Sequence, residues 1–186
     1  MTKVILCSAS PRRRELLQTL FPHFEVLKTE SEEHFRYLRP HLCVMDLALQ
    51  KQQGVSAEGD TVVISSDTLV YYRGQYYGKP YTTEKAREML RALSGNTHSV
   101  YTGVAVRKGD DIIVFYDKAY VRFKKLSEGD IEAYLKAYSP LDKAGAYGVQ
   151  DGVTVEKYFG SFSCIMGLPV EKLRAVLQEM GVKDVQ

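Results

Sequence analysis

The stretch from residue 3 to residue 17 constrains the fold most, because it predicts a strand, a tight turn and a helix in immediate succession. Residues 4–6 form a short apolar run that is typical of a buried strand. Ser10 suits a helix N-cap, and Pro11 suits the first helical position because its missing N–H has no helical partner there. Arg12, Arg13 and Arg14 fall in the first helical turn, where cations oppose the helix dipole. The stretch therefore indicates either a solvated basic helix start or a phosphate held by amides, hydroxyls and guanidinium groups.

The rest of the chain alternates predicted strands and helices, which indicates an α/β protein. Strands are expected over residues 24–28, 61–65, 98–107, 112–123 and 153–157, with a hairpin over 69–77. Helices are expected over residues 34–53 with a break at Pro40, over 84–93 with Thr83 as the cap, and over 170–180. Another helix is expected from Ser127 onward, where Ser127 and Asp130 have the spacing of a capping box. The length of 186 residues fits one domain, residues 1–186, with two lobes.

Composition excludes several classes of protein. The net charge of +2 argues against a general polyanion binder, and the absence of a basic stripe or an aromatic platform motif argues against a nucleic-acid partner. No apolar stretch is long enough to span a membrane, and residues 4–6 are too short for a signal peptide. Cys7, Cys43 and Cys164 are odd in number and widely spaced. They indicate reduced core thiols in a cytoplasmic protein rather than a disulfide framework or a metal cluster.

Two polar segments follow predicted strands. Asp67 comes directly after the strand over residues 61–65, and a carboxylate at the carboxyl end of a buried strand is placed where ligands bind in α/β proteins. The alternative is an aspartate that caps a turn. Lys79 lies between Gly78 and Pro80 in a tight loop, a position that solvation alone explains poorly, although the frame of a P-loop is absent.

A second dense motif spans residues 139–150 and is rich in small residues, which let a ligand approach the backbone closely. It carries Asp142, Lys143 and Gln150, and its length and charges favour a functional loop over an ordinary connection. We interpret His98, a lone imidazole at a strand start, as structural.

The candidate functional residues are nearly all charged. They are Ser8, Arg12, Arg13, Glu33, Lys51, Asp67, Lys79, Lys143 and Gln150. Lysines and arginines neutralise phosphate oxygens, while carboxylates hold Mg²⁺ or Mn²⁺ through hard oxygen ligands and activate a water molecule. In-line attack on phosphorus needs mainly positioning and charge stabilisation. The residues therefore predict a metal-dependent hydrolase of phosphate esters or anhydrides.

Several motifs together resemble the Maf family of nucleoside triphosphate pyrophosphatases over almost the whole chain. The matching motifs are residues 8–17 (SASPRRRELL), 66–68 (SDT), 78–80 (GKP), 90–95 (LRALSG), 142–150 (DKAGAYGVQ) and 166–169 (MGLP). The resemblance implies an α/β, ITPase-like fold, in which helices flank an elongated mixed β-sheet and two lobes surround a central cleft. It also implies hydrolysis of a nucleoside triphosphate to the monophosphate and pyrophosphate, with water attacking the α-phosphorus.

The resemblance assigns roles residue by residue. It implies that Asp67 is the catalytic base and that Lys51 and Lys79 take part in catalysis. Metal and phosphate binding carry over to Ser8, Arg13, Glu33, Lys51, Lys79 and Asp67, and substrate choice carries over to Arg12, Thr68 and Gln150. We add Lys143 as a substrate-binding residue because of its place beside Asp142. Glu30 and Glu32 remain alternatives to Glu33 as the metal ligand.

The motif over residues 142–150 looks like that of the branch acting on dTTP and UTP, with modified pyrimidine forms open as further substrates, which implies removal of unwanted nucleotides. The alternatives are the same hydrolysis with 7-methyl-GTP as substrate, and a nucleotide-binding regulator of cell division with little turnover. The family also implies a cytoplasmic homodimer that uses a divalent cation. The sequence departs from the family pattern at Gln52, Asp151 and Cys164.

Overall fold

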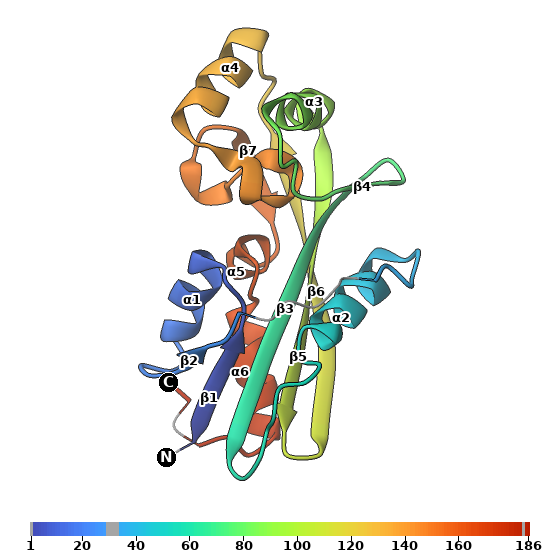
Figure 1. The fold of residues 1–186 in the computed structure, drawn as a ribbon. Helices are drawn as coiled ribbons and strands as arrows, with labels where there is room; N and C mark the ends of the chain where they lie inside the picture. Colours follow the sequence, from blue (N-terminus) through green and yellow to red (C-terminus); the bar gives the residue numbers. More distant parts are fainter. Residues whose placement is uncertain (1, 29–33, 184) are drawn as a thin grey trace. The chain divides into compact units, whose positions relative to one another are not determined.

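A computed structural model describes residues 2–28, 34–183 and 185–186 as an α/β protein (Figure 1). Its strands are β1 (Lys3–Cys7), β2 (Glu25–Val26), β3 (Thr61–Tyr72), β4 (Gln75–Tyr77), β5 (Thr97–Lys108), β6 (Asp111–Phe123) and β7 (Val155–Phe159). Its α-helices are α1 (Pro11–Gln18), α2 (Pro40–Gln50), α3 (Thr83–Leu93), α4 (Glu128–Ala137), α5 (Phe162–Met166) and α6 (Val170–Glu179). Short 3₁₀ helices are η1 (Pro140–Asp142), η2 (Ala144–Ala146) and η3 (Val149–Asp151).

The strands of the described residues form one seven-stranded mixed sheet in the order β2-β1-β3-β5-β6-β7, with β4 paired to β3. Strand β1 runs parallel to β2 and to β3, whereas β4 and β7 are antiparallel to β3 and β6. The predicted mixed α/β fold with flanking helices is confirmed. The chain divides into two compact units, and each is described by itself below.

The first unit comprises residues Met1–Asp67, Thr102–Asp117 and Gly167–Gln186. Alternate residues of β1 and β3 face opposite sides of the sheet, as the period of a strand requires. One side packs against leucines of α1 and α6; this cluster includes Val4, Leu6, Leu17, Leu20, Val62, Ile64, Leu173 and Leu177. The other side carries Ile5, Cys7 and Val63 and is covered by Val55 and Ala57.

Helix α2 lies on this second side of the sheet, very close to β5. The Ser65 hydroxyl donates to the Ala48 carbonyl oxygen over 2.6 Å, which ties β3 to α2. At Gly103 in β5, an added Cβ would lie only 2.2 Å from the Val44 carbonyl oxygen of α2. Glycine is therefore required at residue 103, because any side chain would push against the helix backbone.

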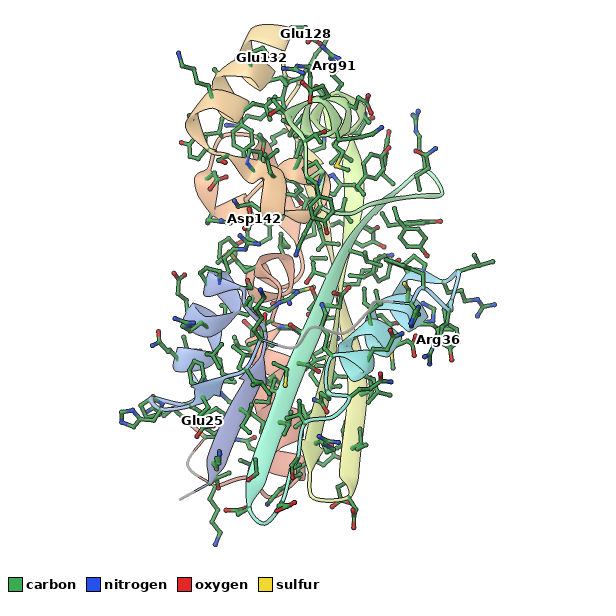
Figure 2. The ribbon with its side chains drawn as sticks, in the orientation of Figure 1. Glu25, Arg36, Arg91, Glu128, Glu132 and Asp142 are labelled. Carbon is green, nitrogen blue, oxygen red and sulfur yellow. The ribbon has the colours of Figure 1, made fainter. Side chains whose placement is uncertain are left out.

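The second unit comprises residues Thr68–Tyr101 and Lys118–Met166. Its core joins α3 and α4 to the sheet and to the 3₁₀ segments through a buried cluster that includes Leu90, Leu93, Phe123, Ile131, Tyr134, Ala146 and Tyr147. Figure 2 shows Arg91, Glu128 and Glu132 gathered where α3 and α4 lie side by side. Arg91 forms an ion pair with Glu128 over 2.6 Å, and Arg87 pairs with Glu132.

The structure corrects several predicted boundaries. Helix α2 begins at Pro40 rather than at residue 34, because the residue before a proline is disfavoured in helical conformation. Strand β2 is limited to Glu25–Val26 within the predicted range 24–28. Thr82, not Thr83, caps α3, and its side chain accepts a hydrogen bond from the Lys85 amide. In the described parts of the chain, no helix combines the length and the apolar character that crossing a membrane requires.

Candidate active site

Asp67 lies within a strand, not after one, which corrects the sequence prediction. Strand β3 continues from Thr61 to Tyr72 because Thr68, Val70 and the two tyrosines at its end are β-branched or aromatic residues that suit a strand. Asp67 itself is 8% exposed. A carboxylate so placed needs a specific partner, because burying an unpaired charge is expensive.

Lys51 is that partner. It is the C-cap residue of α2, and its ammonium contacts the Asp67 carboxylate and lies 3.4 Å from the Ser66 carbonyl oxygen. The two side chains of the pair are only 16% and 11% exposed, so the charges are mostly withdrawn from water. Lys51 and Asp67, both predicted to be catalytic, are therefore brought together by α2 and β3.

The Gly167 carbonyl oxygen connects two further motifs. It accepts hydrogen bonds from the Arg13 guanidinium Nε and from the Ser66 hydroxyl, each over 2.9 Å. Arg13 also donates to the Ser8 hydroxyl over 3.4 Å. Residues of the motifs that begin at Ser8, Ser66 and Met166 thus meet in the first unit, which places a guanidinium, hydroxyls and the Lys51–Asp67 pair on neighbouring segments.

At the start of α1, the hydroxyl of Ser8, rather than that of the N-cap residue Ser10, accepts a backbone hydrogen bond. Ser10 occupies the predicted N-cap position, with extended backbone angles, but its side chain makes no capping hydrogen bond. The Ser8 hydroxyl instead accepts from the Ser10 amide over 3.2 Å. Arg12 is half-buried in the first turn of the helix, which contains no acidic residue. This end of α1 therefore offers positive charge without a neighbouring acidic side chain in its first turn, and phosphate binding there stays a prediction.

The predicted metal ligand Glu33, with its alternatives Glu30 and Glu32, lies outside the described residues. Within the described ranges, no group of three or more His, Cys, Asp or Glu side chains is placed to hold a metal ion. Asp67 is thus the one predicted metal ligand that the structure describes, with one of its oxygens on Lys51.

In the second unit, the loops that carry Lys79 and Lys143 are hydrogen-bonded to each other. The Gly145 amide donates to the Gly78 carbonyl oxygen over 3.2 Å, and the Tyr81 amide donates to Leu141 over 3.3 Å. Lys79 is exposed, whereas Lys143 is half-buried and pairs with Asp142 over 3.1 Å. The structure therefore brings these two predicted lysines onto adjoining loops, while Thr68 is half-buried in β3.

The loop around Lys143 is anchored by a buried aromatic cluster. His98 Nε2 lies 2.8 Å from the Tyr147 hydroxyl, and Phe123 packs edge-on against both rings. Burial lowers the pKa of His98 to about 4, and it raises the pKa of Tyr147, so both side chains are uncharged at neutral pH. His98 is structural, as predicted, and holds the segment that leads to Gln150.

Two residues that no prediction linked to Gln150 meet beside it, Tyr134 and Asp151. The Tyr134 hydroxyl accepts from the Gly148 amide over 3.0 Å and donates to the Asp151 carboxylate over 2.5 Å. Tyr134 lies in α4, outside every motif quoted from the sequence, so no local pattern connects it to residues 148–151.

The predicted burial of the three cysteines is confirmed. Cys7, Cys43 and Cys164 are buried and form no disulfide. Burial raises the pKa of the Cys7 thiol to about 11, although Arg107 acts against the shift. Cys7 is therefore a protonated, unreactive core thiol at neutral pH.

The fold is similar to that of two solved structures. One is the Ham1 protein of Staphylococcus aureus, with a TM-score of 0.56 and 14% identity over 96% of this chain and 100% of that chain. The other is a HAM1 protein from Coxiella burnetii, with a TM-score of 0.52 and 14% identity over the same shares. At this low identity the likeness concerns the fold alone, which is therefore of the Ham1-like α/β class.

The sequence narrows this class to one family. The chain belongs to the Maf-like protein family, whose pattern matches residues 3–180. Curated relatives named dTTP/UTP pyrophosphatase, from Bacillus cereus and Bacillus anthracis, are each 41% identical over 186 residues. The aligned region covers 98% of this chain and 97% of each relative. The resemblance noted from the motifs is thereby confirmed.

Proposed function

We propose that this protein hydrolyses nucleoside triphosphates, dTTP and UTP above all, to the monophosphate and pyrophosphate. The observation that carries the proposal is the buried Lys51–Asp67 pair, next to the Ser66–Gly167–Arg13 connections. It places an acid and two cations on neighbouring segments, as phosphoryl transfer to water requires. The dTTP/UTP pyrophosphatases that are 41% identical over nearly the full length support the same reaction and base preference.

In the proposed reaction Asp67 accepts a proton from the water molecule that attacks the α-phosphorus. The new bond joins the water oxygen to this phosphorus, and the bond to the bridging oxygen of the β-phosphate breaks, so pyrophosphate leaves with its electron pair. Lys51 fixes the Asp67 carboxylate through their ion pair. Ser8, Arg13 and Lys79 neutralise or bind phosphate oxygens. The rest of the nucleotide is bound by Arg12, Thr68, Lys143 and Gln150. The orientation of these groups supplies most of the rate enhancement.

A divalent cation, Mg²⁺ or Mn²⁺, is part of the proposal. The donor set fits, because Asp67 and Glu33 offer carboxylate oxygens, the ligands that such cations prefer. When bound, the cation would neutralise charge on the phosphate oxygens. Asp67 and Glu33 would help to hold the cation, and Asp67 would keep its role as proton acceptor.

The experiment is a measurement of pyrophosphate release from dTTP, UTP, CTP, GTP, 7-methyl-GTP and ITP, with Mg²⁺, with Mn²⁺ and with EDTA. Metal-dependent release that is fastest with dTTP and UTP is expected. Fastest release from 7-methyl-GTP would keep the reaction and refute the base preference. Binding without release from any triphosphate would favour the alternative, a nucleotide-binding regulator of cell division. The variant Asp67→Asn is expected to bind nucleotide without releasing pyrophosphate.

We further propose that residues 1–186 act as one domain and that two copies form a homodimer in the cytoplasm. Strands β3, β5 and β6 each include residues of both compact units, which supports a single folding domain. Calorimetry is expected to give one unfolding transition, and light scattering is expected to give twice the chain mass of 21.1 kDa. Two separate transitions, or the mass of a single chain, would refute these proposals.

A further inference from the structure

The segment that carries Gln150 is fixed at both ends by buried side chains. Upstream, Tyr147 is buried between His98 and Phe123. Downstream, the Tyr134 hydroxyl contacts Gly148 and Asp151, the residues two before and one after Gln150. Both anchors belong to the second unit, and neither was needed to explain the proposed chemistry.

The Tyr134 hydroxyl both accepts and donates a hydrogen bond. It accepts from the Gly148 amide and gives its proton to the Asp151 carboxylate over 2.5 Å, a length typical of a charge-assisted O–H···O bond. Tyr134 is 2% exposed, and its burial together with Asp151 raises the pKa of its hydroxyl, which therefore keeps its proton at neutral pH. Such a bond is rigid, because its donor comes from a packed helix.

Gly148 lies directly beneath the two side chains that follow it. A Cβ at this residue would lie 2.7 Å from the Gln150 side-chain nitrogen and 2.8 Å from the Asp151 carboxylate. Its φ of −114° is open to any residue, so glycine is needed for space and not for backbone conformation. The Gln150 amide and the Asp151 carboxylate thus pack over the same α-carbon.

We propose that Tyr134 and Asp151 are positioning residues that hold Gln150 for selection of the nucleotide base. This inference rests on the proposed function, in which Gln150 contacts the base. A glutamine amide discriminates between bases only if its donor and acceptor are held in one orientation, because a freely rotating amide satisfies either pattern. The bonds of Tyr134 to Gly148 and Asp151 fix the chain on both sides of Gln150, and the glycine at residue 148 leaves the space in which its amide packs.

The test compares kcat/KM for dTTP with kcat/KM for GTP in Tyr134→Phe, Asp151→Ala and Gly148→Ala. Each variant is expected to lower the ratio about 5- to 10-fold, the equivalent of one hydrogen bond, with kcat for dTTP changed less than about twofold. Asp151→Asn is expected to restore most of the ratio, because its amide oxygen still accepts from the Tyr134 hydroxyl. The matched control is Tyr138→Phe, since Tyr138 stacks on Tyr134 at 5.0 Å.

An unchanged ratio in Tyr134→Phe and Asp151→Ala, or an equal fall in Tyr138→Phe, would overturn the proposal. The ¹⁵N side-chain amide resonance of Gln150, assigned through Gln150→Ala, gives a second readout that needs no turnover. It is expected to shift in Tyr134→Phe and Asp151→Ala and to stay in place in Tyr138→Phe. If the wild-type protein released no pyrophosphate while this resonance shifted, the proposed function and base selection would fail, but the positioning of Gln150 would stand.

Discussion

Replacement of Gly103 by alanine is expected to damage both stability and activity, because β5 and α2 touch there without any intervening side chain. The new Cβ would lie 2.2 Å from the Val44 carbonyl oxygen and 2.6 Å from the Met45 amide nitrogen, where ordinary contact begins at 3.4 Å. Helix or strand must therefore move by about 1 Å, and a backbone cannot rotate away as a side chain can. We expect a loss of at least about 3 kcal/mol, the upper end for overpacked sites.

Activity should fall along with stability, because α2 ends at Lys51, which holds Asp67. A displacement of about 1 Å at a catalytic group reduces turnover by roughly a hundredfold. Urea denaturation is expected to show a midpoint lower by on the order of 1 M. Pyrophosphate release is measured without urea, at a temperature at which the variant is folded. The control is Gly129→Ala in α4, where a Cβ meets only the Ser127 hydroxyl at 3.7 Å.

Gly129→Ala should stabilise the protein by about 0.5–1 kcal/mol, since alanine is the better helix former. If Gly103→Ala unfolded at the wild-type urea midpoint, the close approach of α2 to β5 would be refuted. If it also kept the wild-type turnover, a displacement of α2 that reaches Lys51 would be refuted as well.

The remaining predictions concern buried polar groups. Lys51→Met and Asp67→Asn should each destabilise the protein by about 3 kcal/mol, because each leaves a buried charge without its partner, whereas the double variant should lose less than the sum. Burial lowers the pKa of His98 from 6.5 to about 4, so the unfolded chain binds a proton that the folded chain does not between these pH values. Stability should therefore rise with pH across this window, by up to about 3 kcal/mol, and this slope should be lost in His98→Gln. Gln52→Ala should destabilise by about 2 kcal/mol, because the buried amide donates to the Val63 and Ala105 carbonyl oxygens over 3.0 and 2.7 Å.

All three are read from urea midpoints, measured as a function of pH for His98. Additive losses in the Lys51→Met/Asp67→Asn double variant would mean that the two charges do not interact. A His98→Gln protein with the wild-type slope between pH 4 and 6.5 would assign that slope to another group. A Gln52→Ala protein as stable as wild type would mean that the two strand carbonyls are satisfied without Gln52.

The sequence predicted those parts of the fold that a few neighbouring residues determine. Pro11 begins α1, and the Ser127–Asp130 capping box begins α4, as expected. The hairpin between β3 and β4 turns at Arg73 and Gly74, both with positive φ, as a two-residue hairpin requires. Where two neighbours offer the same local signal, as Thr82 and Thr83 do, the prediction chose the wrong one.

Features that depend on residues far apart in sequence were not predictable in this way. The partner of Asp67 comes from α2, and the partner of Asp151 comes from α4. The requirement for glycine at residue 103 arises from α2 and not from any turn signal around it. For the site, residue types and motifs indicated phosphate chemistry, but which groups touch depends on tertiary packing. The predicted roles of Glu33, Lys79 and Gln150 stay predictions.

The acceptor that joins Arg13 to Ser66 is the backbone carbonyl of Gly167, and a backbone atom is common to every amino acid. No amino-acid substitution can remove this carbonyl oxygen. Mutation reaches this junction only through its two donors or through the conformation of residue 167, whose φ of 107° is accessible to glycine and to few other residues. In a saturation library, residue 167 should therefore tolerate almost no replacement, although it has no side chain of its own. The contact between the segments of Arg13 and Ser66 therefore depends on residue 167 having no side chain.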